Sequence, residues 1–125
     1  MDNGIRETDL YSPVRDYLSG LGYKVRGEVK KCDLAAECNG ELVVVEFKKN
    51  FTLRLVYQAL ERFALTDQVY VAIPRPKMVD TPEYRGMLRL LKKLELGLLT
   101  VAMDSPVKTV DALIYPEPHN RQRQW

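Results

Sequence analysis

The sequence contains a single histidine, His119, which lies in a polar segment after Pro116 and Pro118. Ser-His-Asp and Cys-His triads, histidine-ligated zinc sites and histidine-based nuclease sites all need an imidazole in the folded body, so we exclude these classes. The seven glycines form neither G-x-G-x-x-G nor G-x-x-x-x-G-K-[ST], so dinucleotide and P-loop nucleotide binding have no support. Any chemistry must therefore rest on carboxylates, lysines and an added metal.

The sequence also has only two cysteines, no long apolar run and only a small excess of positive charge. Cys32 and Cys38 lack C-x-x-C spacing, which indicates free thiols. The longest apolar runs, such as 42–45 and 98–102, fall far short of the roughly 20 residues that span a bilayer, and no signal peptide is visible. We therefore expect a cytoplasmic protein with no membrane partner. The net charge of +2 is too small to indicate nucleic-acid binding, so local clustering would have to explain it.

The pattern of apolar residues predicts one α/β domain over residues 1–115 and a flexible polar tail at 116–125. Helices are expected to start near Asp9, after Thr52 and after Thr81, with the two threonines as N-caps. Strands are predicted at 23–29, 33–38, 41–48, 68–73, 98–103 and 108–115. The resulting order, αβββαβαββ, predicts a mixed central sheet in an α/β sandwich.

The second predicted helix should have a buried apolar stripe and an opposite polar face. The expected stripe consists of Leu53, Val56, Leu60, Phe63 and Ala64. The expected polar face consists of Arg54, Gln58, Glu61 and Arg62. Arg62 is a candidate to grip a phosphate, and an ordinary solvated helix face is an equal alternative. On the third helix, Arg85, Arg89, Lys92 and Lys93 are interpreted as a solvated face.

The dipeptide Asn39-Gly40 predicts a two-residue hairpin turn between the second and third strands. In that register Cys38 faces Glu41, and the numbers of every opposing pair add up to the same value. Asp33 then lies opposite Glu46, with Cβ atoms about 4.5 to 5.5 Å apart on one face of the sheet. Lys48 projects from the same face, because it is two residues beyond Glu46.

Two opposed carboxylates repel each other unless a cation lies between them. Mg²⁺ suits such a pair, because it binds oxygen ligands and commonly uses one or two carboxylates together with waters and substrate phosphates. The alternative is a solvated hairpin face in which Lys48 pairs with Glu46. The third strand is apolar on both faces before Glu46, and a carboxylate at the end of such a strand favours the site.

An acidic residue at the start of the first helix, then Asp33, then Glu46-Phe47-Lys48 and a helix with Gln58 together resemble the PD-(D/E)XK nuclease superfamily. Within it, the segments 7–11, 32–33 and 65–67 look most similar to a bacterial family of uncharacterised PD-(D/E)XK phosphodiesterases. The likeness covers residues 7–74 well and the rest loosely. One departure is Cys32, which stands where the motif has proline.

The resemblance implies a restriction-endonuclease-like three-layer α/β/α sandwich. It also implies a metal-dependent nuclease or phosphodiesterase, a hydrolase that uses Mg²⁺ or, as a substitute, Mn²⁺. The roles that it assigns are Asp33 and Glu46 as metal-binding and catalytic acids, Lys48 as the catalytic lysine, Phe47 as a carbonyl ligand, Glu7 as a water-mediated ligand and Gln58 as a residue near the site. A metal-associated water would attack the phosphorus in line.

Basic residues cluster at this end of the predicted hairpin, where Lys31 precedes Asp33 and Lys49 follows Lys48. Such a cluster attracts a phosphate backbone in a salt-dependent and largely sequence-independent way. We therefore expect nucleic acid as the partner, with DNA favoured over RNA, and leave a homodimer open. Two alternatives remain: a non-catalytic module of the same fold that binds nucleic acid or a protein, and an isolated domain of a longer enzyme.

Overall fold

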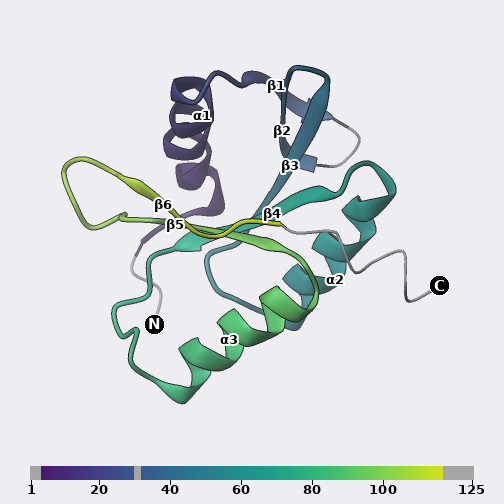
Figure 1. Cartoon of the computed structure of the whole chain (residues 1–125). Coiled ribbons are helices and arrows are strands. Elements are labelled where there is room, and N and C mark those ends of the chain that lie inside the picture. The colour runs from purple at the N-terminus through teal and green to yellow at the C-terminus, as the bar shows by residue number, and fades with distance from the viewer. Residues whose placement is uncertain (1–3, 30–31, 117–125) are drawn as a thin grey trace.

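A mixed β-sheet with helices on both faces forms the centre of the protein (Figure 1). The computed structural model describes residues 4–29 and 32–116. Its helical elements are the 3₁₀ turns η1 (Glu7–Leu10) and η2 (Arg62–Ala64) and the helices α1 (Tyr11–Gly20), α2 (Leu53–Glu61) and α3 (Pro82–Lys93). Its strands are β1 (Lys24–Val29), β2 (Cys32–Cys38), β3 (Glu41–Phe47), β4 (Gln68–Pro74), β5 (Gly97–Val101) and β6 (Val110–Ile114). This arrangement confirms the predicted α/β class.

The strands lie side by side in the order of the chain, from β1 to β6. The pairs β1–β2, β2–β3 and β5–β6 are antiparallel, whereas β3–β4 and β4–β5 are parallel. The carboxyl ends of β3, β4 and β5 therefore meet at one edge of the sheet. In open α/β sheets this edge is where ligands usually bind.

Two apolar clusters cover the two faces of the sheet. On one face, Leu10, Val14 and Leu18 from η1 and α1 pack against alternate residues of the hairpin, among them Val45 and Phe47. On the other face, α2 and α3 pack against β4 and β5 through Leu55, Ala59, Met87 and Leu91. Figure 1 shows α1 on one side of the sheet and the pair α2 and α3 on the other. Because side chains alternate between the two faces along β3, Glu46 points away from the face that holds Val45 and Phe47.

The β2–β3 hairpin follows the predicted register. Asn39 and Gly40 have φ of 54° and 82°, as a type I′ turn requires. The five paired positions run from Cys38 opposite Glu41 to Leu34 opposite Val45. Both predicted N-caps are also confirmed, because the Leu55 N–H donates to Thr52 Oγ1 at 3.1 Å and the Tyr84 N–H donates to Thr81 Oγ1 at 3.0 Å.

The predicted stripe of the second helix is correct only in part, because Val56 is buried and Leu60 and Phe63 are partly buried against the core. Leu53 is 61% exposed and Ala64 is also exposed, whereas Leu55, Val56 and Ala59 are buried. Apolar residues occupy a wide arc of this helix, and the side that faces the sheet is chosen by contact with β3 and β4. The helix is therefore rotated from the expected orientation, and Gln58 and Arg62 of the expected polar face become half-buried.

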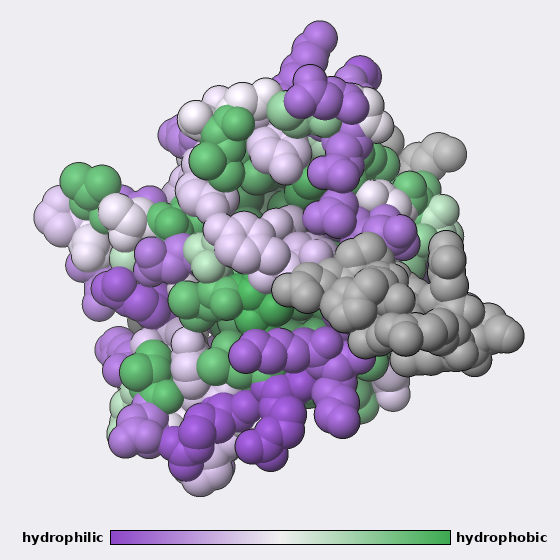
Figure 2. All heavy atoms as spheres, in the orientation of Figure 1, coloured by the Kyte–Doolittle hydropathy of each residue, from purple (hydrophilic) through white to green (hydrophobic). Residues whose placement is uncertain are grey.

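The ends of several elements also differ from the predictions. The first helix is preceded by the 3₁₀ turn η1, in which the Arg6 N–H donates to the Asp9 carboxylate at 2.9 Å, and Pro13 falls in the first turn of α1. The last two strands are shorter than expected, ending at Val101 and starting at Val110. The basic stripe of α3 is exposed, and Figure 2 shows hydrophilic side chains gathered along that helix.

Cys38 carries a free thiol, as expected. None of the helices in the described ranges is long and apolar enough to cross a membrane.

Candidate active site

Asp33 and Glu46 lie next to each other at the edge where β3 ends. Each lies one residue beyond the pair Leu34–Val45, which is the last paired position of the two strands. The Phe47 N–H donates to Asp33 Oδ2 at 2.8 Å, and the backbone of Asp33 in turn donates a hydrogen bond to the Glu46 carboxylate. The backbone of the hairpin thus holds the two acids close together.

The Glu46 carboxylate is buried, with only 3% of the residue exposed. Its Oε2 accepts a hydrogen bond from Arg62 Nε at 3.1 Å, and the Arg62 side chain is itself 15% exposed. Burial raises the pKa of Glu46, the hydrogen bond from Arg62 opposes this rise, and the negative charge of Asp33 adds to it. Desolvation and repulsion therefore outweigh the attraction of the arginine.

The carboxyl group of Asp33 is half-buried and behaves in a similar way. Burial raises its pKa, the hydrogen bond from the Phe47 N–H lowers it, and the charge of Glu7 raises it further. Two neighbouring carboxyl groups whose ionised forms are both disfavoured make a site that an added cation would stabilise. The two carboxyl groups therefore fit a metal ion, and oxygen donors of this kind suit Mg²⁺.

Lys48 and Glu7 meet at the same edge of the sheet. Their Nζ and Oε2 atoms lie 3.5 Å apart, and both side chains are partly exposed, at 26% and 42%. The Lys48 N–H donates to the carbonyl of Ala72 at 3.1 Å, which fixes the chain as it leaves β3. The turn η1 contacts β3 and β4, so Glu7 comes near Asp33 although 26 positions separate them in the sequence.

The backbone N–H of Phe47 belongs to the site, because it donates a hydrogen bond to the Asp33 carboxylate. Its ring points to the other face, is 4% exposed and packs edge-on against Tyr11 with ring centres 6.2 Å apart. That contact anchors the end of β3 beneath α1. The role of the Phe47 carbonyl as a metal ligand stays a prediction.

The candidate nucleic-acid residues are distributed differently from the expectation. Arg62 points inward and pairs with Glu46, so its guanidinium group is largely buried and is not directed at a phosphate in solvent. Gln58 is half-buried on α2, and Lys49 is exposed directly after Lys48. Lys31 lies outside the described residues. The pairing of Arg62 with Glu46 could not be read from the sequence, because it depends on the rotation of α2.

Within residues 4–29 and 32–116, no group of three or more acidic, cysteine or histidine side chains converges as a ready metal cluster. A Mg²⁺ ion would therefore have to be held by Asp33 and Glu46 together with backbone and water oxygens, an arrangement that this ion commonly adopts. The chain matches no protein-family model, no curated protein and no solved structure. The function of this protein is therefore proposed from the site residues alone.

Proposed function

We propose that this protein is a metal-dependent phosphodiesterase of the nuclease type, with a restriction-endonuclease-like α/β/α fold. The observation that carries the proposal is the pair Asp33 and Glu46, held side by side at the carboxyl end of a parallel strand with Lys48 next to it. Nucleic acid, DNA in preference to RNA, is the proposed substrate. A cytoplasmic location is a further expectation, and whether two chains pair is left open.

Each residue of the site has a distinct task in this proposal. Asp33 and Glu46 would hold Mg²⁺ or Mn²⁺, which when bound supplies a Lewis acid at the phosphate and lowers the pKa of a coordinated water. The Lys48 ammonium would stabilise the negative charge that develops on the phosphate oxygens. Glu7 orients this ammonium through their ion pair. Arg62 donates to the buried carboxylate of Glu46 and favours its ionised form, which partly offsets the rise in pKa that burial causes.

Calorimetric titration with Mn²⁺ tests the proposed ligands without any substrate. Asp33→Asn and Glu46→Gln should each weaken Mn²⁺ binding at least about tenfold, because a carboxylate charge is lost from the pair. Glu41→Gln is the matched control, since Glu41 is an exposed carboxylate at the opposite end of the same strand. Equal affinities in all four proteins, or binding in none of them, would overturn the metal site.

Cleavage assays then test the reaction itself. The wild-type protein should cut at least one member of a panel of duplex, branched and single-stranded DNA and RNA in Mg²⁺ or Mn²⁺. Lys48→Met should lose cleavage and retain Mn²⁺ binding, whereas Glu46→Gln should lose both. Metal binding without cleavage of any substrate would argue against the catalytic role.

A second candidate function is a non-catalytic module that binds nucleic acid or a protein. The observation in its favour is that Arg62 already pairs with Glu46 and that Glu7 already pairs with Lys48, so two of the three carboxylates of the site have a cationic partner within the chain. This function predicts no Mn²⁺ binding at Asp33 and no effect of Lys48→Ala on the affinity for a partner. The titration above separates the two candidates.

A further inference from the structure

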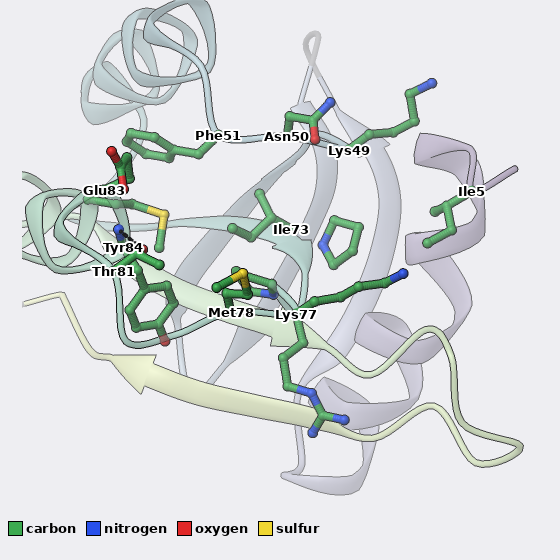
Figure 3. Close-up of a pocket in the computed structure, with 14 residues that line it drawn as sticks. Ile5, Lys49, Asn50, Phe51, Ile73, Lys77, Met78, Thr81, Glu83 and Tyr84 are labelled. Atoms are coloured by element: carbon green, nitrogen blue, oxygen red, sulfur yellow. Dashed lines mark hydrogen bonds between the residues drawn. The ribbon is translucent and has the colours of Figure 1, made fainter. Parts of the chain in front are cut away.

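A pocket of about 670 Å³ lies beside the candidate active site. It is bounded by residues 49–51 after β3, residues 73–78 at the end of β4, the first turns of α3 and Ile5 (Figure 3). We refer to it as the β4–α3 pocket. Its position follows from the parallel pairing of β3 and β4, whose carboxyl ends open at the same edge.

The β4–α3 pocket is continuous along the chain with the proposed catalytic residues. Lys49 directly follows Lys48, and Ile5 stands two positions before Glu7. The hydrogen bond from the Lys48 N–H to the Ala72 carbonyl joins the two wall segments just before they separate around the pocket. The pocket therefore lies at the carboxyl end of β3, which also carries Glu46 and Lys48 of the candidate site.

One end of the pocket is apolar and aromatic. Phe51, Met87 and Tyr84 line it and are packed against the core under α2 and α3. The main chain of Tyr84 is fixed by its hydrogen bond to the N-cap residue Thr81. Figure 3 shows Phe51, Thr81 and Tyr84 gathered at this end. Rings held in place by the core offer a base a surface on which to stack.

The remainder of the lining contains three cationic side chains among apolar and uncharged polar residues. Lys49, Arg75 and Lys77 contribute to it, and Glu83 is the single acidic residue among the described residues of the lining. Arg75 also lies 4.0 Å from Asp104, with both side chains well exposed. In Figure 3 the Lys77 ammonium extends away from the aromatic end, toward Ile5. The pocket thus combines an aromatic end with a positively charged side.

We propose that the β4–α3 pocket binds one nucleotide unit, with the base against Tyr84 and Phe51 and a phosphate near Lys77 and Lys49. The proposal rests on the function proposed above and narrows its substrate to nucleic acid with an unpaired nucleotide. A base stacked inside a duplex is not accessible to a side pocket unless it is extruded, and extrusion costs the free energy of unstacking and unpairing. A purely apolar ligand would leave the cationic side chains without an anion, and a purely acidic ligand would leave the aromatic end without a contact.

Binding in EDTA tests this proposal separately from metal-dependent cleavage. The probes are a fluorescein-labelled single-stranded DNA octanucleotide and a blunt hairpin duplex without unpaired ends, followed by anisotropy. We expect the single strand to bind at least about tenfold more tightly than the duplex. A titration of the labelled full chain with thymidine 5′-monophosphate, followed by NMR, distinguishes a free nucleotide from a nucleotide within a strand as the natural ligand. In both cases the resonances of residues 49–51 and 81–84 should shift.

Two variants with matched controls locate the binding. Tyr84→Leu retains an apolar side chain for the core and should weaken binding of the octanucleotide about tenfold, as expected for loss of one stacked base. Tyr57→Leu removes an exposed ring from α2 and should have no effect. Lys77→Gln should weaken binding more than Lys93→Gln, which removes an equal charge from the exposed end of α3.

The proposal is overturned if the duplex binds as tightly as the single strand, if no probe binds, or if Tyr84→Leu and Tyr57→Leu have the same effect. Because Lys77 is exposed, Lys77→Gln keeps the test valid even if Tyr84→Leu fails to fold. Nucleotide binding without any metal-dependent cleavage would contradict only the proposed catalysis. Cleavage that the pocket variants leave unchanged, together with absent nucleotide binding, would contradict only the pocket.

Discussion

Two ion pairs at the edge of the sheet differ in how far they are withdrawn from water. In Arg62–Glu46 the side chains are 15% and 4% exposed, whereas in Lys48–Glu7 they are 26% and 42% exposed. A buried charge that loses its partner has no water to replace it, whereas an exposed one is readily solvated. The comparison indicates that Arg62 stabilises the fold around the site and that Lys48 is free to change partners when a substrate arrives.

Breaking the buried pair should have the largest effect. Arg62→Met leaves the Glu46 carboxylate buried without its arginine, and we expect the free energy of unfolding to fall by about 3 kcal/mol at pH 7. Urea unfolding followed by circular dichroism measures it. The double variant Arg62→Met/Glu46→Met, which replaces both charges with apolar groups, should recover most of the loss. A fall below about 1 kcal/mol in the single variant would contradict the assignment.

Metal binding should stabilise the folded protein, because a cation would offset the repulsion between the two carboxylates, which Arg62 offsets only in part. Mn²⁺ at 100 times its dissociation constant should raise the free energy of unfolding of the wild-type protein by about 2.7 kcal/mol. The Asp33→Asn variant should gain much less under the same conditions, and Glu41→Gln should gain as much as the wild type. An equal gain in Asp33→Asn would place the ion elsewhere.

The free energy of unfolding should depend on pH because of the carboxylate pair Asp33 and Glu46. The folded protein raises the pKa of both Asp33 and Glu46, chiefly because they are buried. The folded state then binds more protons than the unfolded state as pH rises above the ordinary carboxyl pKa of about 4, so these groups lower the stability with rising pH. Without divalent ions, Asp33→Asn should decline less in stability than the wild type between pH 4 and pH 7. A steeper decline in the variant would contradict the shift.

Removal of the exposed pair should have the smallest effect on stability. Lys48→Met should change the free energy of unfolding by less than about 1 kcal/mol, because both charges of this pair are partly solvated. The same urea titration measures the change alongside Arg62→Met. A loss as large as that of Arg62→Met would mean that Lys48 is a structural residue and would weaken its proposed catalytic role.

The parts of the fold that depend on neighbouring residues in the chain were predictable. The turn at Asn39-Gly40 needs positive φ at both positions, and it sets the register that leads to Asp33 and Glu46. The N-caps Thr52 and Thr81 satisfy free N–H groups within their own helices, so they too could be recognised from local sequence.

The orientation of α2 was not predictable from the sequence, because its apolar residues allow more than one side to face the sheet. Packing buries Leu55, Val56 and Ala59 and exposes Leu53. This choice turns Arg62 toward Glu46. The β4–α3 pocket depends in the same way on how α3 packs beside the end of β4, since its walls come from segments far apart in the chain.

Turn geometry and alternation along a strand are local properties, so the hairpin, its two acids and the order of helices and strands follow from the sequence. The pairing of Arg62 with Glu46, the pairing of Glu7 with Lys48 and the pocket lined by basic and aromatic residues depend on how the elements pack together. Those contacts join residues on different elements, and which side chains meet is set by the packing of helices on the two faces of the sheet.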